Sequence, residues 1–253
     1  MRSISLVIFL FVATSFVKPN TVVTRFKAPT GYSRIATTPG SFASWLQNRP
    51  LKPTGTHTLT YRGSVARTDP YTAAVIDISV GQQDLQQCAD AVMRLRAEYQ
   101  YSKKDYKAIT FNFTSGFKCD FVHFAEGYRY EQSGVWKKLA KKDYSYNSFL
   151  KYMNLVFSYA GTLSLEKELQ KINNANDLNI GDVFIKGGSP GHCFIVMDVA
   201  VNKAHQKKFL LAQSFMPAQN IQIVQNGSPW FSLTGPANIP YGELINAAYL
   251  KRF

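Results

Sequence analysis

Between Gly181 and Val224 the sequence reads as four successive β-strands. Apolar and β-branched residues fill segments 181–185, 192–199, 207–214 and 220–224. Turn-forming residues separate them at Gly188–Gly191, at Asn202-Lys203 and at Met216-Pro217. Strands joined by short turns pair with antiparallel neighbours. The second half of the chain is therefore predicted to form an antiparallel sheet.

The first half carries most of the helical patterns. Predicted helices cover residues 41–48, 85–101, 145–160 and 164–172, and shorter predicted strands cover 56–61, 73–80 and 107–113. The helix over 85–101 has Asp84 as its predicted N-cap, since a short acceptor side chain satisfies the first free backbone N–H groups. The expected fold class is α+β, with a helical first half and an antiparallel sheet in the second half.

The N-terminus has the layout of a secretory signal peptide. Arg2 precedes an apolar run over residues 6–12, and the small residues Ala13 and Ser15 follow. We expect residues 1–15 to be removed and residues 16–253 to form a single α+β domain, because no linker or repeat divides them. No other apolar run reaches the roughly 18 residues of a membrane span. The expected location is periplasmic or extracellular.

The composition is strongly basic, with a formal net charge of +13. Such an excess favours acidic partners at the cell envelope, although scattered lysines also form ordinary solvated surfaces. The lysine pairs are dispersed and no recognised nucleic-acid module is present, so nucleic acid is not an expected partner.

The chain contains three cysteines, Cys88, Cys119 and Cys193, too few for a disulfide framework to stabilise a domain of this size. At least one thiol is therefore free or pairs between chains. Cys88 falls near the start of the predicted helix 85–101, where the helix N-terminus favours a thiolate. The alternative is a buried core cysteine, because Cys88 also belongs to the apolar stripe of that helix.

The histidine of interest is His192, which follows Ser189-Pro190-Gly191 and opens an apolar strand. This position predicts a side chain at the rim of the sheet, where a neutral imidazole can act as a base. The other three histidines have no cysteine, acid or histidine at metal-ligand spacing. We therefore expect no metal site and no cofactor.

A base in such a site needs a polar group that orients it. Side-chain alternation places His192 on one face with Phe194, Val196 and Asp198. The hairpin loop decides the partner on the next strand. An even loop brings Gln213 to the His192 face, and an odd loop brings Ser214 there. Asn202-Lys203 favours an even loop, and Gln213 is the predicted orienter.

Two resemblances extend this interpretation. Gly181-Asp182-Val-Phe-Ile, Gly191-His192 and Phe209-Leu-Leu-Ala-Gln213 resemble the second half of NlpC/P60 and wider papain-like hydrolases. The resemblance implies a papain-like fold with Cys88 as nucleophile, His192 as general base and acid, and Gln213 as orienter. It also implies oxyanion donors from the Cys88 backbone N–H and from Gln82 or Gln86.

The second resemblance covers the whole chain. The segments Ser41-Phe-Ala-Ser-Trp-Leu, Asp84-Leu-Gln-Gln-Cys-Ala-Asp-Ala and Pro217-Ala-Gln219 are similar to those of a secreted bacterial family, domain of unknown function 4846, common in Bacteroidetes. This family resemblance implies no established activity.

The expected function is amide hydrolysis, with a peptide or an acidic, peptidoglycan-like polymer as substrate. Predicted substrate-binding residues are Gln86, Arg94 and Trp136. Asp90, Arg94 and Glu98 at i,i+4 spacing are expected to form a surface ladder. If that ladder faces a cleft instead, Arg94 is placed to grip a substrate carboxylate. The rival is a non-catalytic envelope protein on the same fold, whose aromatic side chains, Trp136 among them, bind glycan or peptide.

Overall fold

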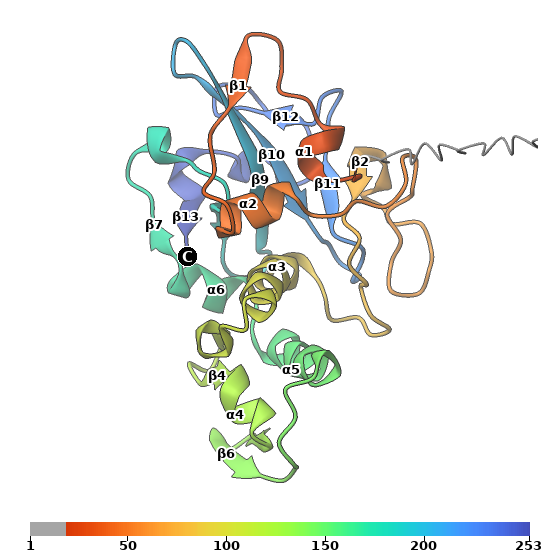
Figure 1. The fold of residues 1–253 in the computed structure, drawn as a ribbon, viewed down its shortest axis with the longest axis vertical. Helices are drawn as coiled ribbons and strands as arrows, with labels where there is room; N and C mark the ends of the chain where they lie inside the picture. The colour runs from red at the N-terminus through yellow and green to blue at the C-terminus, as the bar shows by residue number, and fades with distance from the viewer. Residues whose placement is uncertain (1–18) are drawn as a thin grey trace, which may run out of the picture.

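A computed structural model describes residues 19–253 (Figure 1). The predicted signal peptide, residues 1–15, lies outside the described residues. No helix of the described part is both long and apolar enough to cross a membrane.

A large antiparallel sheet forms the upper part of the molecule (Figure 1). Its strand order is β2-β11-β10-β9-β8-β13-β7, and β1 and β12 add to β9 and β10. The strands are β1 (Tyr32–Arg34), β2 (Thr72–Val75), β7 (Gln170–Lys171), β8 (Val183–Lys186), β9 (His192–Asn202), β10 (Lys207–Gln213), β11 (Gln222–Val224), β12 (Trp230–Phe231) and β13 (Leu250–Arg252). The long strand β9 occupies the centre, so a residue at its first position lies at one end of the sheet.

The helices and two small hairpins complete the fold. The helices are α1 (Val22–Arg25), α2 (Phe42–Gln47), α3 (Cys88–Ser102), α4 (Phe121–Ala125), α5 (Tyr146–Tyr159) and α6 (Thr162–Glu168). One hairpin pairs β3 (Thr110–Asn112) with β4 (Lys118–Asp120), and the other pairs β5 (Tyr128–Glu131) with β6 (Val135–Lys138). Helix α3 lies between the sheet and a lower lobe that contains α4, α5 and both hairpins (Figure 1).

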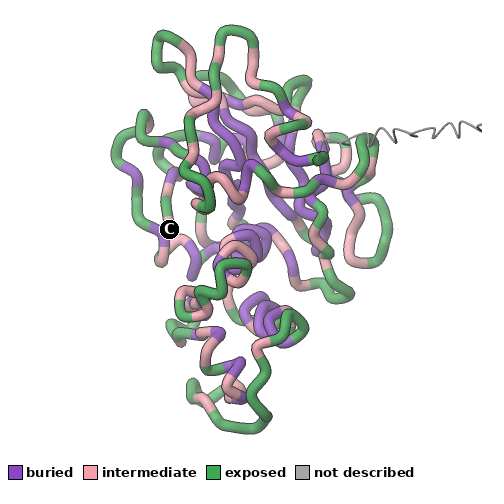
Figure 2. The backbone as a smooth tube through the Cα atoms, viewed as in Figure 1, coloured by how far each residue is buried: buried purple, intermediate pink, exposed green. Residues whose placement is uncertain are grey.

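One apolar core connects the sheet to this lower lobe. The buried cluster includes Val92 and Leu95 of α3, Ile195 of β9 and Phe149 of α5. Figure 2 shows the buried backbone concentrated along the central strands and along α3 and α5, with exposed backbone around them. Helix α3 therefore packs on both sides, which explains why its buried residues extend beyond a single apolar stripe.

The mixed α and β content and the antiparallel sheet of the second half confirm the expected fold class at that level. The predicted helices over 41–48 and 145–160 are also present as α2 and α5, with Ser41 and Ser145 as N-caps. The strand predicted over 56–61 is wrong, because this segment contributes only isolated bridges at Leu59 and Thr60.

Candidate functional site

Cys88 is the first residue of α3. The helix was expected to begin at Leu85 behind an Asp84 cap, but Gln87 is the N-cap and Asp84 instead accepts hydrogen bonds from Gln87 Nε2 and Ala218 N. This later start places the Cys88 side chain at the end of the helix, where the first backbone N–H groups have no partner within the helix. Burial raises the pKa of the Cys88 thiol, and the backbone amides of Ala89 and Cys88 offset only part of that rise.

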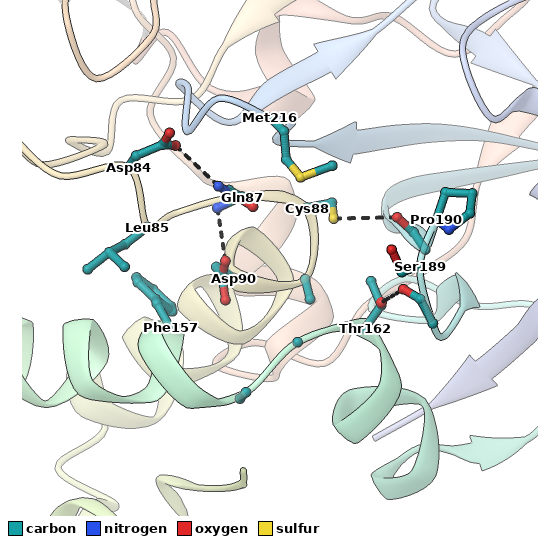
Figure 3. A pocket seen from close by; sticks show the side chains of 15 residues that line it. Asp84, Leu85, Gln87, Cys88, Asp90, Phe157, Thr162, Ser189, Pro190 and Met216 are labelled. Atoms are coloured by element: carbon teal, nitrogen blue, oxygen red, sulfur yellow. Dashed lines mark hydrogen bonds between the residues drawn. The ribbon is translucent and has the colours of Figure 1, made fainter. Parts of the chain in front are cut away.

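Strand β9 meets Cys88 through the two residues that flank His192. The Cys88 Sγ lies 3.9 Å from the carbonyl oxygen of Gly191 (Figure 3). The Cys193 Sγ donates to the carbonyl oxygen of Cys88 at 3.3 Å. Gly191 has to be glycine, since a Cβ there would approach the backbone carbonyl oxygens of Gly188 and Lys186 to 2.5 and 2.9 Å. The helix start and the strand start are therefore adjacent, although no hydrogen bond joins the Cys88 and His192 side chains among the described residues.

His192 is buried and is held by Gln213. Its Nε2 lies 2.7 Å from Gln213 Oε1, and an amide oxygen only accepts, so Nε2 carries the proton. The other nitrogen, Nδ1, therefore holds a lone pair. Nδ1 has no hydrogen-bond partner among the described residues. Gln213 Nε2 also lacks a partner and is fully buried, whereas Nδ1 is not fully buried. In this tautomer Nδ1 is the imidazole nitrogen that is able to accept a proton.

A β-bulge brings Gln213 to this face. Val199 pairs with Phe209 and Val201 with Lys207, which is the register of an odd loop and corrects the expected even one. That register, if continued, would bring Ser214 to the His192 face. The register shifts between Leu210 and Leu211, and Gln213 takes the position instead.

The same bulge corrects the placement of Asp198. Val196 pairs with Leu211 and Asp198 with Leu210, so the two β9 residues face opposite sides. Asp198 therefore does not share the His192 face. It forms an ion pair with Arg34, 2.5 Å from Asp198 Oδ2 to Nε, and accepts from Gln47 Nε2 of α2 at 2.8 Å.

Aromatic rings enclose the imidazole. The Tyr241 ring stacks on it at 4.7 Å between centroids and 22° between planes, and Phe194 and Phe215 contact it at steeper angles. Tyr241 has a left-handed backbone, φ 61°, which is uncommon for a bulky side chain. Nothing in the local sequence around Tyr241 predicted this contact.

Burial keeps the cysteine and histidine neutral. Desolvation, with a smaller effect from Asp90, raises the pKa of the Cys88 thiol to about 11, and desolvation lowers the pKa of His192 to about 4. A thiolate–imidazolium pair at pH 6, with a thiol pKa of roughly 3–4 as in papain-like pairs, is therefore not what this environment favours. Near neutral pH the folded protein therefore holds both the Cys88 thiol and the His192 imidazole uncharged.

A cavity of about 260 Å³ opens beside Cys88 (Figure 3). Its walls come from the start of α3, the end of α5, the start of α6 and the loop 188–191, and Met216 lies above Cys88 (Figure 3). Cys88 is 8% exposed, whereas Cys119 and Cys193 are fully buried. Among the three thiols, which are all unpaired, Cys88 alone lines this cavity.

Asp90 also lines the cavity, and sequence reasoning did not select it as a site residue. Its Oδ2 accepts from the Gln87 backbone N–H at 3.0 Å, while Oδ1 is buried without a partner. Desolvation raises the pKa of this carboxyl to about 8. An acid at the third position of a helix is a common capping residue, so no local pattern marks Asp90 for any other role.

The other predicted binding residues lie away from the cavity lining. Arg94 pairs with Glu98 at 2.7 Å and donates to Gln86 Oε1 and Tyr146 Oη. The Arg94–Glu98 part of the expected ladder is therefore present, but Arg94 is buried, not on the surface, and Asp90 takes no part because it caps the helix start. Gln86 is buried in its contact with Arg94, and Trp136 packs on His123 in the lower lobe. The structure brings Cys88, His192 and Gln213 into one region, and Gln86 lies beside them, where its carbonyl oxygen accepts from Ser214 Oγ at 2.9 Å. None of Gln86, Arg94 and Trp136 lines the cavity.

No group of three or more histidine, cysteine, aspartate or glutamate side chains in residues 19–253 is arranged to hold a metal ion. The cavity lining contains two carboxyl groups, Asp84 and Asp90, and no lysine, arginine or histidine. The site therefore offers a thiol, a neighbouring imidazole and acidic acceptors.

The fold and this site define a small α+β protein with a cysteine at a helix start beside a histidine–glutamine pair. Comparison with known families matches residues 22–244 to the domain of unknown function (4846). The chain belongs to this family. No curated protein and no solved structure matches the chain.

Proposed function

We propose that the protein is an extracytoplasmic, papain-like cysteine hydrolase that cleaves amide bonds in cell-envelope peptides. One observation carries the proposal: Cys88 opens α3 at a cavity and contacts both neighbours of His192, whose Nε2 is held by Gln213. Nucleophile, base and orienter in this order are the arrangement of a thiol hydrolase. The sequence resemblance to NlpC/P60 proteins supports the same class.

In the proposed reaction His192 Nδ1 takes the Cys88 proton while Sγ attacks the substrate carbonyl carbon. The tetrahedral oxyanion is stabilised by backbone N–H groups at the helix start, those of Cys88 and Ala89. The imidazolium then protonates the leaving nitrogen, the C–N bond breaks and a thioester remains on Cys88. Water, deprotonated by His192, hydrolyses the thioester and restores the thiol.

This step requires Nδ1 and Sγ to reach hydrogen-bonding distance when substrate is bound, since catalytic contacts often tighten only in the complex. Gln213 holds the imidazole tautomer through the cycle. The neutral resting pair means that the proton moves during attack, not before it.

Thiol reactivity and hydrolysis are tested together. Iodoacetamide is expected to modify Cys88 before the two sealed cysteines, with a rate that climbs through the alkaline range because the thiol pKa is about 11. Peptide mass spectra locate the label. With peptidoglycan-derived peptides, the native protein should yield new amine ends and a transient thioester on Cys88.

Matched variants separate the roles. Cys88→Ala should abolish cleavage, His192→Ala should reduce it by roughly 10²-fold or more and Gln213→Ala by less, because a general base contributes about 10²–10⁴-fold. Cleavage that survives Cys88→Ala would rule the mechanism out. Cys88 that is labelled only after denaturation, together with no cleavage, would instead favour the non-catalytic binding protein.

The extracytoplasmic part of the proposal rests on the N-terminal sequence alone. Expressed in a bacterial host, the protein should be recovered from the periplasm lacking residues 1–15. A cytoplasmic product that retains Met1 would contradict export.

A further inference from the structure

The lower lobe ends in an exposed segment that is both basic and apolar. Segment 135–142 reads Val-Trp-Lys-Lys-Leu-Ala-Lys-Lys and contains four lysines and no acidic residue. It comprises β6 and the residues after it, at the end of the molecule away from the large sheet (Figure 1). Every residue of the segment except Trp136 is exposed, and Figure 2 shows exposed backbone around this end of the lobe. The segment takes no part in the cavity beside Cys88.

Two large apolar side chains of this segment are held in solvent. Val135 is 50% exposed and Leu139 is 60% exposed. Trp136 packs into the lobe, so Val135, which is next to it on the strand, faces the opposite side. The backbone N–H groups of Leu139 and Ala140 both donate to the carbonyl oxygen of Gly127, at 3.0 and 2.9 Å. These contacts fix the backbone, so neither apolar side chain is able to turn inward.

The four lysines are available to an external partner. Lys137 pairs with Glu131 at 3.3 Å, and Lys142 pairs with Glu126 at 2.8 Å. Both lysine side chains are more than half exposed, at 61% and 66%, and ion pairs at such exposure are weak. The other two lysines of the segment form no ion pair with any described residue. An anionic partner therefore has little internal competition.

We propose that segment 135–142 docks the protein on an anionic phospholipid surface. The lysines meet the lipid phosphates, and Val135 and Leu139 enter the boundary between headgroups and acyl chains. An acidic polysaccharide or a nucleic acid matches the lysines but leaves both apolar side chains in water. A lipid surface accommodates both, because its charge lies directly above an apolar layer. This inference does not depend on the proposed hydrolase function.

The first test is sedimentation of the full chain with vesicles. One set is phosphatidylcholine alone, and the other contains equal parts of phosphatidylcholine and phosphatidylglycerol. Each lysine near an anionic membrane strengthens binding roughly fivefold, so the anionic vesicles should bind the protein at least about tenfold more tightly. Added salt should weaken that binding by screening the phosphates. The neutral vesicles measure any contribution of the apolar run over residues 6–12.

Matched variants separate charge from apolar contact. Replacing all four lysines of the segment with glutamine should weaken binding to anionic vesicles about tenfold or more. Val135→Thr together with Leu139→Ser should weaken it about fivefold or more, because apolar area then no longer leaves water. The control replaces four exposed lysines elsewhere with glutamine and should change binding by roughly twofold at most. Those control positions are Lys27, Lys171, Lys186 and Lys203. Thermal unfolding verifies that each variant is folded.

A tryptophan at the proposed contact reports its position directly. Leu139→Trp should add fluorescence that brominated phosphatidylcholine in anionic vesicles quenches, because the ring enters the lipid boundary. Val65→Trp is the control, since Val65 is also an exposed apolar residue, at 58%, but belongs to a loop beside the large sheet. Its added fluorescence should remain unquenched.

Equal binding to neutral and anionic vesicles, an equal loss of binding in the control lysine variant, or no quenching at position 139 would each overturn the proposal. Binding that falls when the lysines are replaced but not when Val135 and Leu139 are replaced would also overturn it. That result would assign the segment to an acidic polymer.

Discussion

At the residue scale, the imidazole of His192 has one hydrogen-bond partner among the described residues, the side chain of Gln213. Burial lowers its pKa to about 4, while the bond to Gln213 raises that pKa slightly. Because the pKa in the unfolded chain is about 6.5, the unfolded state binds more protons between about pH 4 and 6.5. The contribution of His192 to the free energy of unfolding therefore becomes smaller as pH falls through that window.

Gln213→Glu should raise the His192 pKa by about one unit or more, since a carboxylate at hydrogen-bonding distance stabilises the imidazolium. Histidine NMR titration of the native protein and the variant gives both values. Gln206→Glu, on the exposed hairpin turn, is the matched control and should leave His192 unchanged. A native His192 that titrates near 6.5 would contradict the burial described here.

At the element scale, the bulge in β9 separates two sets of polar contacts made by one strand. Before the bulge, His192 lies on the face of Gln213, whereas Asp198 after the bulge turns toward α2 and β1. Asp198 is fully buried and binds Arg34 and Gln47. This polar contact attaches the N-terminal elements to the central strand.

Asp198→Ala should reduce the free energy of unfolding by about 3–5 kcal/mol, because it leaves the Arg34 guanidinium and the Gln47 amide without their acceptor. Urea denaturation monitored by circular dichroism measures the loss. Asp77→Ala, an exposed carboxylate after β2, should cost less than about 0.5 kcal/mol. A loss below 1 kcal/mol for Asp198→Ala would mean that the contact is not a structural anchor.

At the scale of the whole molecule, helix α3 joins the sheet to the lower lobe through one buried cluster. The three tryptophans report separate regions: Trp45 in α2, Trp136 in the β5–β6 hairpin and Trp230 in β12. If residues 16–253 fold as a single domain, all three should lose their native environment together.

Variants that retain one tryptophan each, with phenylalanine at the other two positions, should show coincident fluorescence transitions in urea. The shared midpoint should match that from circular dichroism. An earlier transition for the Trp136 reporter alone would make the lower lobe a separate folding unit.

The sequence alone predicted the antiparallel sheet, α2 and α5, because alternation, turn residues and serine N-caps act over a few neighbouring residues. It also selected Cys88, His192 and Gln213 as candidates. Tertiary structure decided how they are arranged. The bulge beside Met197 changed which residues of β10 lie on the same face as His192. Gln87 took the place of Asp84 as the N-cap of α3, and the Tyr241 ring, from near the end of the chain, stacks on His192. The acidity of the cavity and the neutral state of its groups depend on burial, which is set by elements distant in sequence and is therefore absent from any local pattern.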